Sequence, residues 1–143
     1  METVKTESRE DALRRMYTEN NLIKEDVFKH KHFVIITRSG IEKIMENKGI
    51  TIQYDPIKME QQFVVIKAVA SLNGKTVETF GEASPRNTSN SYLVAIAEKR
   101  ALSRAVLKLA GYYQHGVFSE DESDDFKRKQ EELFNQIKDL GLE

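Results

Sequence analysis

The chain has 143 residues, a length that suits one domain, and 39% of them are hydrophobic, which is enough to bury a core. Its 22 basic residues nearly cancel its 23 acidic residues, so any site for a polyanion must be local. The absence of cysteine excludes disulfides, thiolate zinc sites, iron–sulfur clusters and cysteine nucleophiles. The polar start of the chain predicts no signal peptide, and no apolar run approaches the roughly 20 residues of a membrane span. We therefore expect a soluble, cytoplasmic protein.

The N-terminal segment, residues 1–29, is highly charged and predicts a helical extension of the main domain. Ala12, Leu13 and Met16 follow at the spacing of one helix face. We expect this helix to pack on the edge of the domain or on a neighbouring chain.

A short strand, a helix and a second strand come next. Residues 32–37 contain an uninterrupted apolar run, which is typical of a strand covered on both faces. Ser39, with Glu42 three residues later, has the pattern of a capping box, and Gly49 has the place of a C-cap. These signals predict a helix between them. Residues 50–54 alternate between apolar and polar types, which predicts a half-buried strand that the following Asp-Pro dipeptide ends.

A long β-hairpin is the clearest local prediction. Residues 61–72 alternate between two faces, and they are followed by Asn73-Gly74, the strongest short signal for a tight turn. Both residues of such a turn need a positive φ, which asparagine and glycine tolerate. The chain returns over residues 75–81, and this turn places Lys67 opposite Phe80 across the ladder.

The longest helix signal runs from Ser91 to Ala110 and is closed by Gly111. Its basic residues follow at intervals of four, and their stripe is predicted to lie nearly opposite the core face. The basic stripe consists of Arg100, Arg104 and Lys108. The core face, which we expect to lie on the sheet, consists of Ala95, Leu102, Ala105, Val106 and Leu109.

Apolar residues also lie beside the basic stripe, where a helix that is wet on one side should be polar throughout. These residues are Leu93, Ile96 and Leu107. We therefore expect the outer surface of this helix to be shared with a neighbouring subunit, with the cations at its border. The alternative is an ordinary solvated face on which repulsion between like charges is tolerated.

Residues 119–125 carry five acids, which suit the positive N-terminal end of a last amphipathic helix. The chain thus divides into a charged helical extension (1–29), an α+β core (30–118) and an acidic linker with an amphipathic helix (119–143). The expected fold class is α+β: a curved antiparallel β-sheet with a long β-hairpin, packed by one long helix, with short helices near both ends. The apolar stripe of the last helix comprises Phe126, Leu133, Phe134, Ile137 and Leu140.

The stretch that begins at Gly81-Glu82-Ala83 and continues from Ala97 to Gly111 has the character of a family signature. It resembles the annealing domain of the single-strand annealing proteins of the Rad-fifty-two type, and of small phage and mobile-element proteins related to them. The order of elements is similar as well: a helix that ends near Gly-Ile, a strand, a long hairpin that turns at Asn-Gly, and a long helix with a Lys-Arg-Ala-Leu core. The resemblance covers residues 33–118.

This resemblance implies a homo-oligomeric ring or filament in a bacterial or phage-infected cell. In that family a positively charged groove holds single-stranded DNA with its phosphates inward and its bases free to pair. Lys99 and Arg100 match the Lys-Arg pair that lies in the groove, and Arg104 takes the place of the next basic residue. Arg38 and Lys43 correspond to a basic groove position near the start of the preceding helix. A cognate single-strand-binding protein is a further partner that the resemblance suggests, and a membrane is not.

Annealing of this kind is not an enzymatic reaction, so we expect no catalytic residue, no cofactor and no metal. It requires phosphates held by Lys and Arg, with released counterions supplying much of the free energy, and base edges left free. Lys67, on the outer face of the hairpin, adds a contact in this interpretation; the alternative is that it only keeps the strand soluble. Tyr112 and Tyr113 either stack on bases or fill an edge of the core.

Two other functions are compatible with the same sequence. A double-stranded-RNA-binding module shares the order of helix, three strands and helix, but its cations lie at the start of the last helix, whereas here they come later. The second alternative function is that of a structural ring or interaction protein, which recruits a partner without binding nucleic acid. The acidic run at 119–125 would itself repel DNA. Binding of single- and double-stranded oligonucleotides, together with the mass in solution, distinguishes these functions.

Overall fold

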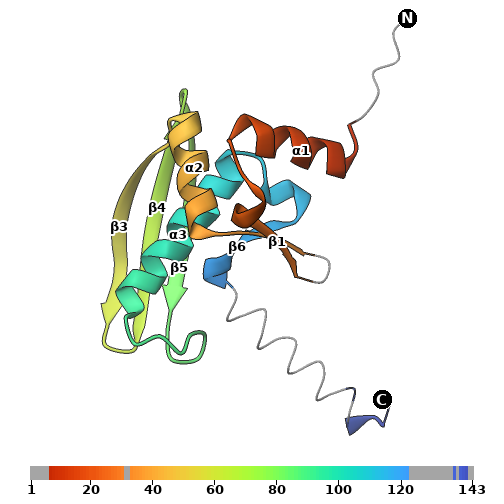
Figure 1. Ribbon diagram of the computed structural model, residues 1–143. Helices are drawn as coiled ribbons and strands as arrows, with labels where there is room; N and C mark the ends of the chain where they lie inside the picture. The colour runs from red at the N-terminus through yellow and green to blue at the C-terminus, as the bar shows by residue number, and fades with distance from the viewer. Residues whose placement is uncertain (1–6, 31–32, 123–136, 138, 142–143) are drawn as a thin grey trace, which may run out of the picture.

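The structure is a computed structural model that describes residues 7–30, 33–122, 137 and 139–141 (Figure 1). The expected α+β class is confirmed, with one long helix packed on a largely antiparallel set of strands. The helices are α1 (Arg9–Glu19), α2 (Arg38–Lys48) and α3 (Leu93–Leu109), with the 3-10 turns η1 (Lys24–Asp26), η2 (Tyr113–His115) and η3 (Glu120–Glu122). The strands are β1 (Val27–His30), β2 (Phe33–Ile36), β3 (Thr51–Glu60), β4 (Phe63–Leu72), β5 (Lys75–Ala83) and β6 (Val117–Ser119).

The larger sheet has the strand order β3-β4-β5 and contains the predicted hairpin. Asn73 and Gly74 form its turn with φ values of 49° and 83°, and Lys67 pairs with Phe80 as expected. The hairpin is therefore confirmed in both turn and register.

The first strand of this sheet is longer than predicted. β3 continues through Pro56 and pairs with β4 as far as Glu60, with a register shift between Pro56 and Lys58. The prediction that Asp-Pro ends the strand is wrong, because β3 lies at the edge of the sheet and an edge strand can accommodate a proline.

Small side chains let α3 lie very close to this sheet. Ala97 and Ala101 are fully buried, and a Cβ added to Gly81 of β5 would lie only 2.0 Å from the carbonyl oxygen of Ala97. Thr79 Oγ1 of the same strand donates a hydrogen bond of 2.7 Å to the carbonyl oxygen of Ala101. Ala95, which was predicted to face the sheet, is instead exposed.

A second layer covers the C-terminal half of α3. The run predicted as a strand is confirmed as β2, which pairs antiparallel with β1 and parallel with β6. α2, β6 and η3 all contact α3. Leu107, which was predicted to face a neighbouring subunit, is only 1% exposed because the same chain encloses this half of the helix.

α2 confirms the predicted helix but begins at a different cap. Thr37 is the N-cap, because its side chain accepts a hydrogen bond of 3.2 Å from the backbone nitrogen of Gly40. The predicted cap, Ser39, lies inside the helix. The helix ends at Gly49, whose φ of 73° is the left-handed conformation expected of a C-cap glycine.

α1 confirms the predicted N-terminal helix and is fastened to the core by Tyr112. The Tyr112 hydroxyl donates to the carbonyl oxygen of Met16 at 2.8 Å and accepts from Asn20 Nδ2 at 2.9 Å. Burial raises the pKa of this hydroxyl above its ordinary value, so it stays protonated and can donate. Tyr112 is fully buried and therefore fills the core, while the ring of Tyr113 packs edge-on against Phe118.

Most of the predicted C-terminal amphipathic helix lies outside the described residues. Of its apolar stripe, Ile137 and Leu140 are described, and both are exposed. In the part of the chain that the structure covers, no helix is long and apolar enough to cross a lipid bilayer.

Candidate nucleic-acid interface

α3 carries the predicted cations and has two unlike halves. From Arg100 to Leu107 the helix is largely buried between the two layers. Nearer its start, Val94, Ala95 and Lys99 are exposed, because this end extends past the second layer (Figure 1). A polynucleotide could therefore reach the N-terminal half of α3 directly.

Lys99 and Tyr92 are the exposed cation and the exposed ring of this open half. Lys99 is exposed, and none of the described residues forms an ion pair with it. Tyr92, at the residue before α3, is 75% exposed. Tyr92 is the N-cap of α3 and its ψ of 73° lies outside the helical range, so the helix repeat does not fix the direction of its ring relative to Lys99. An exposed ring and an exposed cation are the groups that stack on bases and neutralise phosphates in proteins that bind single strands.

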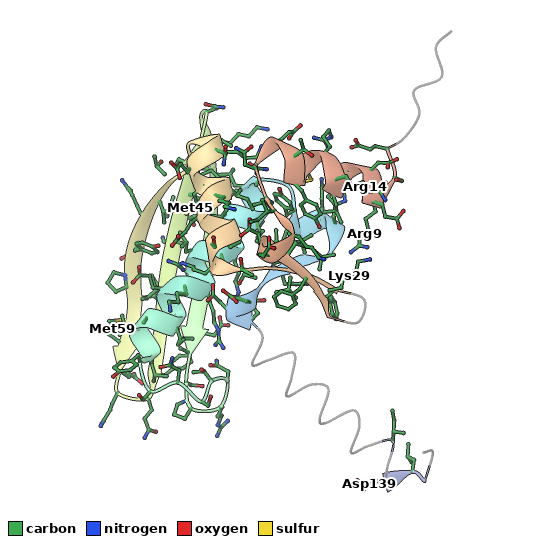
Figure 2. The ribbon with its side chains drawn as sticks, viewed as in Figure 1. Arg9, Arg14, Lys29, Met45, Met59 and Asp139 are labelled. Atoms are coloured by element: carbon green, nitrogen blue, oxygen red, sulfur yellow. The ribbon has the colours of Figure 1, made fainter. Side chains whose placement is uncertain are left out.

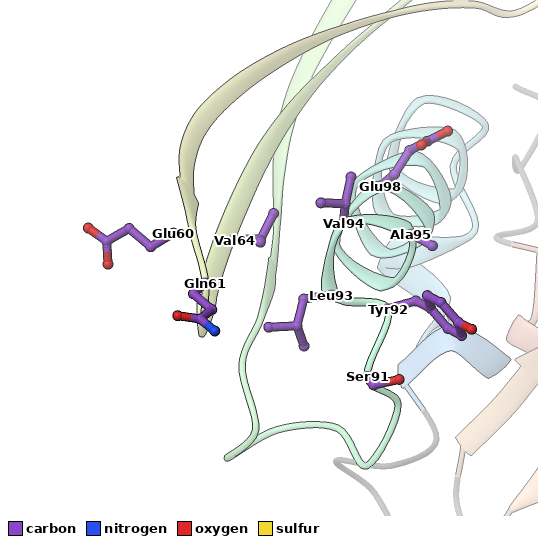
Figure 3. Close-up of a pocket in the computed structure, with 9 residues that line it drawn as sticks. All are labelled: Glu60, Gln61, Val64, Ser91, Tyr92, Leu93, Val94, Ala95 and Glu98. Atoms are coloured by element: carbon purple, nitrogen blue, oxygen red, sulfur yellow. The ribbon is translucent and has the colours of Figure 1, made fainter.

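Tyr92 was missed by the sequence reasoning, which treated it only as part of the helix start. Figure 3 shows its ring projecting from the beginning of α3, away from the β3–β4 turn. Its place at the start of the predicted helix that carries the cations is the sequence signal that could have identified it.

Arg100, by contrast, is an internal cation. Its side chain is among the largest that are fully buried, at 1% exposure. Nη1 donates to the carbonyl oxygen of Glu82 (2.9 Å) and to Asn87 Oδ1 (2.8 Å), and Nη2 donates to the carbonyl oxygen of Asn87 (2.9 Å). Nε donates to the carbonyl oxygen of Asp121 at 3.2 Å. The prediction that Arg100 lies on an outer stripe is therefore wrong: it joins β5, the loop before α3, and η3.

Arg104 lies beside the edge of β5 and is already paired. Its Nη1 donates to the carbonyl oxygen of Phe80 at 2.7 Å and is 3.1 Å from Glu82 Oε1, while Nε contacts the Glu122 carboxylate. Burial by itself would lower the pKa of this guanidinium, but the two carboxylates outweigh burial and raise it. Arg104 is therefore permanently charged and partly exposed, with its side chain 19% accessible.

Lys43 is held by a buried carboxylate. Its Nζ lies 2.6 Å from Asp26 Oδ2, and Asp26 is only 3% exposed. Burial acts to raise the pKa of the Asp26 carboxyl, but the Ile23 N–H and the Lys43 ammonium outweigh it and lower that pKa. Lys43 therefore fastens α2 to η1 in this structure.

Lys67 lies on the face of the larger sheet that points away from α3. Its Nζ is 3.9 Å from a carboxylate oxygen of Asp55 and 3.9 Å from one of Glu78. Both distances are long for an ion pair, and pairs of this kind near solvent contribute little. Lys67 is therefore accessible to another anion, but it lies on a different surface from Lys99.

The acidic residues that follow β6 accept hydrogen bonds from donors on α2 and α3. We call Glu120–Glu122 the acidic triplet, and the groups that it contacts the donor strip. The donor strip consists of the backbone N–H of Arg38, the hydroxyl of Ser103 and the guanidinium of Arg104. Glu120 accepts from the Arg38 N–H at 2.7 Å, and Asp121 accepts from the Ser103 hydroxyl at 2.7 Å. The Glu122 carboxylate is in close contact with the Arg104 guanidinium. The Arg38 side chain is paired within α2, with Nε 3.3 Å from Glu42.

A groove of about 490 Å³ lies between the β3–β4 turn and the open end of α3 (Figure 3). Val64, Leu93 and Val94 give it an apolar lining, and Glu60 and Glu98 add two carboxylates. Tyr92 also lines this groove, and because the two acids disfavour a phosphate, Lys99 is the better candidate contact for a polyanion.

In the described ranges, no group of three or more His, Asp or Glu side chains could hold a metal ion. Comparisons of the chain with models of protein families, with curated proteins and with solved structures find no match.

Proposed function

We propose that this protein binds single-stranded DNA as a homo-oligomer and anneals complementary strands, without nucleotide hydrolysis. The observation that carries the proposal is the set of groups at α3: the exposed ring of Tyr92 at its N-cap, the exposed ammonium of Lys99, and the donor strip, to which α3 contributes Ser103 and Arg104. The donor strip already binds oxyanions, because each of its members holds a carboxylate.

The length of this track suits a short stretch of one strand. Tyr92 and Ser103 are separated by eleven residues, which is about 16 Å along a helix at 1.5 Å per residue. At about 3.4 Å per nucleotide, the spacing of a strand stacked as in duplex DNA, this distance corresponds to roughly five nucleotides. Cations would hold the phosphates along α3, and the base edges would stay free to meet a complementary strand.

One chain offers few cations, so tight binding requires several copies that act together. Self-association has a candidate surface at the open edge of β3, where Tyr54, Ile57 and Met59 are 42%, 51% and 55% exposed. Figure 2 shows Met59 at this edge. The opposite edge strand, β5, has part of its backbone occupied by the bond from Arg104 to Phe80. β3 therefore offers the more accessible backbone for a second copy.

The proposal is tested with fluorescence anisotropy of labelled single-stranded DNA, duplex DNA and duplex RNA, together with light scattering after gel filtration. We expect preference for the single strand and a mass greater than that of one chain. Lys99→Gln should weaken binding and lower the salt slope by about 0.7 for each phosphate contact that it removes. Tyr92→Ala should lose about 1–3 kcal/mol of binding free energy for each stacked base, which is roughly 5- to 150-fold in affinity.

The matched control is Lys24→Gln, which removes one exposed lysine from η1 and leaves α3 unchanged. If Lys24→Gln and Lys99→Gln weaken binding equally, the effect is one of overall charge and the track is refuted. A chain that prefers duplex RNA as a monomer would instead be a double-stranded-RNA-binding module, and a large assembly that ignores nucleic acid would be a structural protein. Binding without acceleration of strand pairing would refute the annealing step alone.

A further inference from the structure

The carboxylates of the acidic triplet occupy the donor strip as the phosphates of another ligand would. Each of its three consecutive carboxylates has its own donor: Glu120 Oε1 accepts from the N–H of Arg38, Asp121 Oδ2 accepts from Ser103 Oγ, and the Glu122 carboxylate contacts Arg104. The donors come from two helices, while the acceptors come from one short turn. Three neighbouring oxyanions on one chain are thus bound in series.

The donors are of the kinds that bind phosphates in protein–DNA contacts, namely a backbone N–H at a helix N-terminus, a hydroxyl and a guanidinium. Arg38 is the first residue of α2, and the first turn of that helix contains no acidic side chain of its own. Its positive end therefore takes an anion from elsewhere, and in this structure the anion is Glu120.

The carboxylates and the backbone of the triplet have separate roles. Arg100, which is buried, donates to the carbonyl oxygen of Asp121 and not to its carboxylate. The contacts to the donor strip, in contrast, are made by side chains. An amide in place of each carboxylate therefore keeps the backbone bond to Arg100 while it removes the negative charge from the strip.

We propose that the donor strip is a phosphodiester-binding site and that the acidic triplet is its built-in competitor, which a single strand of DNA displaces. The inference rests on the proposed function, because Ser103 and Arg104 of the strip lie on the same helix as Lys99. The triplet follows β6 directly, so its carboxylates stay close to the strip and compete at a high effective concentration. A polynucleotide binds the strip only in the fraction of molecules in which the triplet has left it, and the measured affinity is reduced by that fraction.

The test compares the wild type with the triple variant Glu120→Gln, Asp121→Asn and Glu122→Gln. If the strip is open in about 1–10% of wild-type molecules, the triple variant should bind a labelled oligothymidylate about 10- to 100-fold more tightly. The matched control, Glu10→Gln, Glu25→Gln and Glu46→Gln, removes three exposed carboxylates elsewhere and has the same net charge as the triple variant. Affinity should rise much less in the control.

The outcomes separate this inference from the proposed function. Equal gains in both variants would mean that net charge alone acts, and an unchanged affinity in the triple variant would mean that the triplet does not compete; either result overturns the inference while the proposed function stands. Absence of oligothymidylate binding in every form overturns the proposed function and the inference with it.

A second measurement needs no variant. Hydrogen exchange of the wild-type protein is followed with and without saturating oligothymidylate. Displacement of the triplet predicts at least a several-fold faster exchange of the Asp121 amide, which bonds to Ser119 Oγ at 3.2 Å in the free chain. Exchange that is unchanged or slower at this amide in the bound protein overturns the inference even if the triple variant fails to fold.

Discussion

The burial of Arg100 predicts that this arginine stabilises the fold and does not contact DNA. Arg100→Met keeps a side chain of similar length but removes this donor from three backbone carbonyls, while the Asn87 amide oxygen keeps its bond of 3.1 Å from the Ser84 N–H. A buried acceptor without a partner costs about 1–3 kcal/mol, so three carbonyls cost about 3–9 kcal/mol. Removing a buried charge returns part of this cost. We expect a net loss of about 3 kcal/mol, which lowers Tm by about 10 °C in a domain of this size.

The assay is thermal unfolding followed by circular dichroism, with DNA affinity measured at about 10 °C on the folded variants. Lys99→Gln, at the neighbouring but exposed position, is the matched control and should change stability by less than about 0.5 kcal/mol. Each variant should therefore lose a different property: Arg100→Met loses stability and keeps DNA affinity, whereas Lys99→Gln loses DNA affinity and keeps stability. If Arg100→Met melts within about 2 °C of the wild type and loses DNA binding, the assignment of Arg100 to the interior is refuted.

Two further predictions concern the packing of α3 and a buried carboxylate. Gly81→Ala should destabilise the protein by about 3 kcal/mol, because its new Cβ would lie 2.0 Å from the carbonyl oxygen of Ala97. The control is Thr76→Ala, an exposed position on the same strand, and a stabilised Gly81→Ala variant in the same melting assay contradicts the prediction. The pKa of Asp26 is lowered by folding, so the stability that its ion pair with Lys43 provides is present above the unfolded pKa of about 3.9 and is lost as pH falls through the folded value. Urea unfolding should therefore show a gap between wild type and Asp26→Asn that closes from about pH 6 to about pH 2, and a constant gap would be inconsistent with the lowered pKa.

What the sequence determined by itself is local. Asn73 and Gly74 tolerate the positive φ that a tight turn requires, so the turn and the alternating strands on either side define one register, with Lys67 opposite Phe80. Gly49 could be assigned as the end of α2 for the same reason. The concentration of basic residues on α3 is likewise visible in the sequence alone.

Only the tertiary structure decided which sides of α3 face water. Leu107 and Arg100 lie where the helix pattern alone predicts an outer surface, yet α2, β6 and η3 enclose them. β6 has only three residues and pairs with a strand more than eighty positions earlier, so no local periodicity announces it. The acidic triplet meets its donors for the same reason: Glu120 and Arg38 are 82 residues apart, and the attraction between them acts only after the core has brought their segments together.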